Sequence, residues 1–92
     1  MVDSEPDAVL RPLSSAAARA TPWASALEIL GGGEVFWFST TRPGGRPHVT
    51  PLPAAWSLDG MCFGLYRVAP TVGFAFGELP TSSQTCYAWP GR

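Results

Sequence analysis

The sequence contains no lysine, a single histidine, two cysteines and no long apolar run. All 6 basic residues are arginines dispersed along the chain, so no basic stripe supports nucleic-acid binding. One histidine and two distant cysteines match no zinc-ligand spacing, which excludes the common metal centres built from these residue types. No apolar stretch approaches the length of about 18 residues that a membrane-spanning helix needs.

Charge is scarce as well, since only 14% of the residues are charged while 46% are hydrophobic. This balance is too apolar for a wholly disordered chain. No basic segment followed by an apolar one opens the sequence, so we expect no secretion signal and a soluble, cytoplasmic protein with reduced thiols. A chain of 92 residues forms one small domain. Such a domain buries roughly 60–65% of its unfolded surface, so its core is marginal without a partner.

The segment "TPWASALEILGGG" predicts a short amphipathic helix over residues 22–30. Thr21 is a favourable N-cap residue, Pro22 suits the first helical position, and the glycines that follow favour a helix end. The apolar residues recur at the i, i+4 and i+7 spacing of one helix face: Trp23, Leu27 and Leu30.

Three strands are predicted after this helix, near residues 34–41, 46–53 and 61–65. "EVFWFSTT" is rich in aromatic and β-branched residues, which favour strands. In "RPHVTPLPAAW" each residue before a proline is driven to an extended conformation, and the missing N–H groups place this strand at an edge or at a bulge. Short Gly-containing turns join the three strands into an antiparallel meander. The fold class is therefore mainly β with a short N-terminal helix.

The pieces "VFWFSTT", "GGRPHVTPLPAAW" and "LDGMCFG", in this order and spacing, resemble the pyridoxamine 5′-phosphate oxidase-like superfamily. The resemblance covers about residues 21–64. It implies the N-terminal part of an antiparallel split β-barrel that binds FMN or a deazaflavin coenzyme, incomplete in this chain. It also implies a flavin- or deazaflavin-dependent oxidoreductase of a small molecule, and a homodimer with the cofactor at its two-fold interface. The substrate stays open between pyridoxine 5′-phosphate and an unrelated reducible compound.

The resemblance also implies which residues bind the cofactor. A strand interrupted by prolines keeps carbonyl and N–H groups available for the polar edge of a planar ring, with Thr50 adding a hydroxyl and Arg46 or His48 near the polar side. No catalytic residue is expected, because the cofactor carries the hydride chemistry. The expected cofactor-binding residues are Arg46, His48, Val49, Thr50, Pro51 and Leu52.

Structural roles compete with these functional ones. Arg46 in a turn is equally explained as a solvated charge, and His48 as a structural residue of a strand face. Trp37 and Trp56 are expected in the core rather than against a cofactor. The alternative function is a non-catalytic remnant or a small dimerising interaction module, which would need none of the ligand contacts.

The two ends of the chain are predicted to be irregular. Residues 1–20 are acidic and then rich in small residues, which predicts a mobile leader. Residues 66–92 show no clean period and lack the basic cluster and helix that hold the cofactor phosphate in the resembled family. Another reading frame from Tyr66 permits such a cluster, so we hypothesise that this irregular tail is out-of-frame translation.

Overall fold

The computed structural model describes residues 5–57, 60–78 and 81–91. Within them the fold is mainly β, with one short helix, and every strand pairing is antiparallel. The elements, in chain order, are β1 (Asp7–Leu10), α1 (Trp23–Gly32), β2 (Val35–Thr41), β3 (Pro47–Pro53), β4 (Ala55–Ser57), β5 (Gly60–Phe63), β6 (Tyr66–Val68), β7 (Val72–Gly77) and β8 (Ser83–Ala88).

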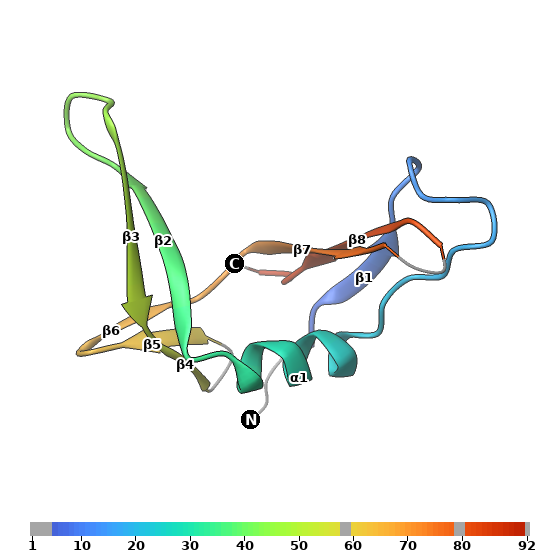
Figure 1. The fold of residues 1–92 in the computed structure, drawn as a ribbon, viewed down its shortest axis with the longest axis horizontal. Coiled ribbons are helices and arrows are strands. Elements are labelled where there is room, and N and C mark those ends of the chain that lie inside the picture. The colour runs from blue at the N-terminus through green and yellow to red at the C-terminus, as the bar shows by residue number, and fades with distance from the viewer. Residues whose placement is uncertain (1–4, 58–59, 79–80, 92) are drawn as a thin grey trace.

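The strands form three small sheets, with the orders β1-β8-β7, β2-β3 and β4-β5-β6, and none of these sheets closes into a barrel. Figure 1 shows the β2–β3 hairpin standing away from the rest of the chain, with α1 running between the β4–β5–β6 sheet and the β1–β8–β7 sheet. The coarse prediction of a mainly β fold with an N-terminal helix is confirmed.

The predicted helix over residues 22–30 is confirmed, with bounds at Trp23 and Gly32. Its start differs from the prediction, because Pro22 holds the N-cap position with extended backbone and no side chain caps the helix. Thr21 is instead tied to β8, where its N–H donates to Oγ1 of Thr85 at 2.9 Å. Thr21, which was expected to cap the helix, therefore connects the start of the helix to the β1–β8–β7 sheet through this hydrogen bond.

The three predicted strands are confirmed as β2, β3 and β5, but they do not form one meander. β2 pairs with β3 along its whole length, while β5 pairs with β4 and β6. Because β3 is bonded to β2, the N–H groups that its prolines lack fall on its other edge, which cannot receive a regular third strand. The chain therefore leaves the hairpin at Ala54 and continues as β4 in a separate sheet.

The prediction of irregular chain ends is wrong for Asp7–Leu10 and for the described segment from residue 66, whereas residues 11–20 contain neither helix nor strand. Asp7–Leu10 forms β1, which pairs with β8, and the segment from residue 66 contributes β6, β7 and β8. The signal that the sequence interpretation missed is a period of two, typical of a strand with one buried face. The buried positions of this period are Ser83, Thr85, Tyr87 and Trp89, and the residues between them are half-buried.

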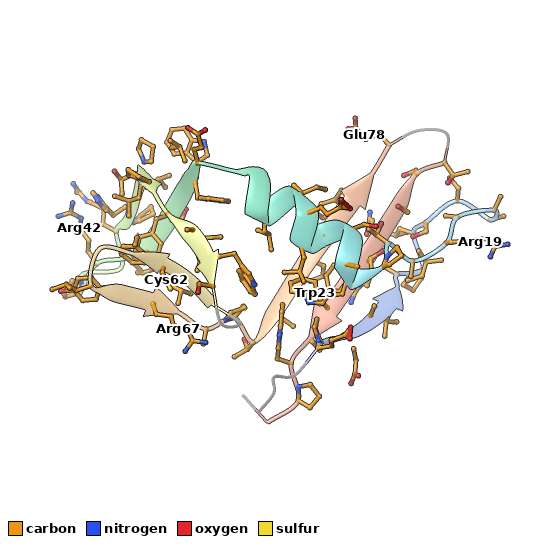
Figure 2. The ribbon with its side chains drawn as sticks, turned by 90° about the horizontal axis from the view of Figure 1, so that it is seen from below. Arg19, Trp23, Arg42, Cys62, Arg67 and Glu78 are labelled. Atoms are coloured by element: carbon orange, nitrogen blue, oxygen red, sulfur yellow. The ribbon has the colours of Figure 1, made fainter. Side chains whose placement is uncertain are left out.

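The core is an aromatic cluster that we define as Trp23, Trp56, Tyr87 and Trp89. The Trp23 ring lies 5.1 Å from Tyr87 and from Trp89, and 5.7 Å from Trp56, between ring centroids. Tyr87 and Trp89 are only 2% and 5% exposed. Figure 2 shows Trp23 between α1 and the β1–β8–β7 sheet. The Trp23 side chain of the helix thus contacts Trp56 of β4, Tyr87 of β8, and Trp89, which directly follows β8.

The molecule has a larger accessible surface and a larger radius of gyration than a compact domain of its size. Its accessible surface is 6701 Å², whereas a compact monomer of 9.8 kDa exposes roughly 5,200 Å². Its radius of gyration is 14.7 Å, against about 12 Å expected for a compact domain of this length. Many large apolar side chains contribute to the excess, among them Trp37, Phe74 and Phe76. In the part of the chain that the structure describes, no helix has the length and hydropathy to cross a membrane.

The bond between Thr21 and Thr85 generates a stability prediction. Thr85→Val keeps the shape of a side chain that is 0% exposed but removes the acceptor of the Thr21 N–H. Leaving that partly buried donor without its acceptor costs about 1–3 kcal/mol of the free energy of unfolding. Urea denaturation followed by circular dichroism measures this loss. Thr41→Val, at an exposed position of β2, is the matched control and should change stability by less than about 0.5 kcal/mol. Equal effects of the two substitutions would contradict the role of the bond.

Candidate functional site

The β2–β3 hairpin has two different faces, because successive residues of a strand point to opposite sides. The inner face lies against β5, where the rings of Phe38 and Phe63 approach to 4.9 Å. The outer face is exposed and apolar, with Trp37 74% and Val49 55% exposed. Trp37 stands directly opposite Pro51 in the register, so these residues share that outer face.

The predicted cofactor-binding residues of β3 divide between these faces. His48, Thr50 and Leu52 are half-buried on the inner face, whereas Val49 and Pro51 lie exposed on the outer one. The Thr50 hydroxyl approaches only the carbonyl of Pro51, at 3.5 Å. Leu52 lines a small cavity of about 100 Å³ between the hairpin and the β4–β5–β6 sheet. The structure therefore does not bring residues 49–52 together as one lining.

The tip of the hairpin brings together side chains that the sequence interpretation treated separately. Nη2 of Arg42 donates to Nδ1 of His48 at 2.8 Å, which makes that nitrogen an acceptor and places the ring proton on Nε2. The Arg42 N–H also donates to the carbonyl of Arg46 at 2.8 Å, which closes the turn. Gly45 permits this turn, with φ at 87°, in the left-handed region.

We call the charged Arg42 and Arg46, together with the His48 ring that binds Arg42, the cationic tip. Both arginines are exposed, and Figure 2 shows Arg42 at the far end of the molecule from Arg19. Arg42 was absent from the predicted site, although "TRPGGRP" contained the signal. Two arginines that flank a short Pro-Gly turn are brought across from one another when the turn closes a hairpin.

The two tryptophans expected in the core behave differently. Trp56 belongs to the aromatic cluster, which confirms the expectation for that residue. The expectation for Trp37 is wrong, because alternation along β2 turns Trp37 outward between the half-buried Phe36 and Phe38. An exposed tryptophan on an apolar sheet face is typical of a surface that contacts a ligand or a partner.

A second candidate site is a cavity of about 420 Å³ between α1 and β7. None of the predicted cofactor-binding residues lines it. The sequence interpretation missed this cavity because seven of its twelve lining residues come from the segment that was expected to be irregular. Its lining residues are Trp23, Ala26, Ile29, Leu30, Trp56, Pro70, Gly73, Phe74, Ala75, Phe76, Tyr87 and Trp89.

No metal centre is evident at either site among the described residues, and the hairpin site contains the imidazole of His48. No group of three or more His, Cys, Asp or Glu side chains is placed to hold a metal ion in residues 5–57, 60–78 and 81–91. The titratable group of the cavity wall is the Tyr87 phenol, whose O–H donates to the carbonyl of Thr21. Burial raises the pKa of Tyr87 above its ordinary value of 10.0. The phenol of the cavity wall therefore stays protonated at neutral pH.

Comparison of the chain with family models, curated proteins and solved structures gives no match. Any functional conclusion therefore rests on the geometry and chemistry of the hairpin and of the cavity. The hairpin combines positive charge with an exposed apolar face, and the cavity is an open apolar pocket lined largely by aromatic residues. These are two separate binding chemistries in one small chain.

The buried phenol generates a pH prediction. The unfolded chain ionises Tyr87 near pH 10.0, while the folded chain keeps the proton, so above that pH the unfolded state binds fewer protons. The free energy of unfolding therefore falls as the pH rises from about 10 toward the folded pKa, and this contribution is fully present at lower pH. Denaturant titrations at pH 8 to 11 measure it. Tyr87→Phe should reduce the fall, whereas Tyr66→Phe, at a position 71% exposed, should leave it unchanged. A fall that is identical in all three proteins would contradict the assignment to Tyr87.

Proposed function

We propose that this chain binds FMN or a deazaflavin coenzyme through the β2–β3 hairpin. The proposal extends the resemblance to the pyridoxamine 5′-phosphate oxidase-like superfamily, in which the chain corresponds to the N-terminal part of a split barrel. The observation that carries it is the combination of a cationic tip with an exposed apolar face on one hairpin. FMN has the complementary combination of a phosphate and a planar ring system.

The cationic tip fits the phosphate end of such a ligand. Guanidinium groups bind phosphate through charge-assisted, often bidentate hydrogen bonds. Arg42 is oriented by its hydrogen bond to His48, which reduces the side-chain entropy lost when a ligand binds. Arg46 lies across the same turn, so both guanidinium groups are available at one end of the hairpin.

The outer face of the hairpin fits the ring system. Trp37, Val49 and Pro51 give a flat apolar surface, and an exposed indole is a favourable stacking partner for a planar ring. When bound, a flavin or deazaflavin supplies hydride transfer to or from a substrate. The chain's own contribution is to hold the phosphate and to shield one side of the ring. The function is then that of an oxidoreductase of a small molecule, with a split barrel incomplete in this chain.

A second copy of the chain would complete the site. The molecule exposes about 1,500 Å² more than a compact monomer of its mass, and a standard interface covers about 800 Å² on each partner. A homodimer that covers the apolar hairpin face removes a large part of this excess. The same exposed face favours the alternative function, a small dimerising interaction module without a cofactor.

The cofactor proposal predicts phosphate-dependent binding of FMN. Because the tip is solvent-exposed, we expect weak affinity, with a dissociation constant of ~10 μM or higher. Replacing both tip arginines, Arg42→Gln and Arg46→Gln, should weaken FMN binding about tenfold or more. Flavin fluorescence during titration with the protein measures the affinity.

Riboflavin and Arg19 supply the matched controls. Riboflavin has the same ring system without the phosphate, so its affinity should not change in the double variant. Arg19→Gln removes an exposed arginine far from the hairpin (Figure 2) and should leave both affinities unchanged. Equal weakening of FMN and riboflavin would contradict a phosphate site at the tip. A protein that binds neither ligand but still dimerises would favour the interaction module.

The dimer generates its own prediction. Sedimentation velocity of the full chain should show a dimer, and Trp37→Glu should shift it toward monomer by placing a charge in the apolar interface. Leu13→Glu, at a position 81% exposed in the loop before α1, is the control and should not change the distribution. A well-folded wild-type monomer, or equal effects of the two substitutions, would contradict the hairpin interface.

A further inference from the structure

The cavity between α1 and β7 exists because β7 turns its small residues toward the helix. Gly73 pairs with Tyr87 and Ala75 pairs with Thr85, so these small residues share the buried face of the sheet. The large residues between and beside them, Phe74 and Phe76, are 52% and 69% exposed. Their rings stack on one another, and both residues also contribute to the cavity lining. Space for a guest molecule therefore remains under the helix.

The wall of this space is aromatic and apolar. Indole and phenol rings of the aromatic cluster form one side, and Ala26, Ile29 and Leu30 of α1 form another. No Arg, Lys, His, Asp or Glu belongs to the described lining. The Tyr87 hydroxyl already donates to the carbonyl of Thr21. A charged guest would lose its hydration without gaining an ionic partner, which strongly disfavours its binding.

The size and shape of the cavity further restrict which molecules can bind in it. The cavity volume of about 420 Å³ lies within the range of roughly 300–1,000 Å³ that is typical of small-molecule sites. The rings of Trp23 and Trp89 stand at 87° to one another, so a flat guest can lie along one ring and present its edge to the other. A polypeptide segment would bring backbone N–H and C=O groups for which this wall offers few partners.

We propose that this cavity is a binding site for an uncharged, planar aromatic molecule of two or three rings. The site is separate from the proposed flavin site, because no residue of the cationic tip or of β3 lines it. Ring contacts and exclusion of water hold the guest, and the absence of charge in the wall sets the selectivity. Binding of an aromatic molecule in this cavity therefore does not depend on FMN binding at the hairpin.

The probe for the experiment is N-phenyl-1-naphthylamine, an uncharged two-ring compound with a pendant phenyl group whose fluorescence rises in apolar surroundings. Its absorption overlaps tryptophan emission, so a probe beside three indoles of the cluster should quench the tryptophan signal as its own emission rises. Its sulfonated analogue, 1-anilinonaphthalene-8-sulfonate, carries the same rings with a negative charge. We expect the analogue to bind about tenfold more weakly or worse.

Two substitutions in α1 test whether the probe binds in this cavity. Ala26→Leu places a larger side chain in the cavity, whereas Ala24→Leu adds the same atoms at an exposed position of α1 that does not line it. The first should weaken probe binding about tenfold or more, and the second should leave it unchanged. Circular dichroism confirms that both remain folded.

A second substitution at a cavity-lining residue keeps the test decisive if Ala26→Leu does not fold. A Cβ at Gly73 would lie 3.7 Å from the Trp89 ring, an ordinary contact, so Gly73→Ala is accommodated and also occupies cavity space. Loss of probe affinity in this variant supports the site. Equal affinity of wild type and both lining variants would overturn the proposal, as would equal affinity for the two probes. Loss of dimerisation in the lining variants would also overturn it, because a second copy would then be the guest.

Discussion

The fold depends on the contacts of a single indole. Trp23 lies in the first turn of the only helix in the described chain, and its ring meets Tyr87, Trp89 and Trp56. Three small sheets cannot each bury a core of their own, because a two- or three-stranded sheet is marginal in isolation. The helix links two of them through this ring, and the Thr21 N–H adds a polar contact beside it. The ring of Trp23 also lines the cavity, while the hairpin site is held against β5 by the contact of Phe38 with Phe63.

The local parts of the fold were predictable from the sequence. The helix and the strands β2 and β3 carry strong short-range signals, namely glycines at the helix end and turn, aromatic content and proline spacing, and these signals do not depend on distant residues. The pairing of Asp7–Leu10 with β8 could not be predicted in the same way, because it joins the two ends of the chain. Long-range pairing is decided by which apolar faces meet, and no local pattern encodes that choice.

The candidate site was predictable in part for the same reason. Arg46 and His48 were identified within one segment, and the hairpin places them as neighbours of Arg42 because the turn is short. The division of residues 49–52 between two faces follows from the strand period and could have been anticipated. The aromatic cavity could not, since its wall combines the helix with strands more than forty residues away.

The prolines of β3 have a consequence for association. Pro47, Pro51 and Pro53 remove most of the N–H donors from the outer edge of β3, so this edge is a poor template for another strand and disfavours edge-to-edge pairing of two copies through it. The outer edges of β2 and β7 have no such protection, because "VFWFSTT" and "VGFAFG" contain neither proline nor charge. Uncontrolled self-assembly into fibres would therefore start at β2 or β7, and the outer edge of β3 would take no part in it.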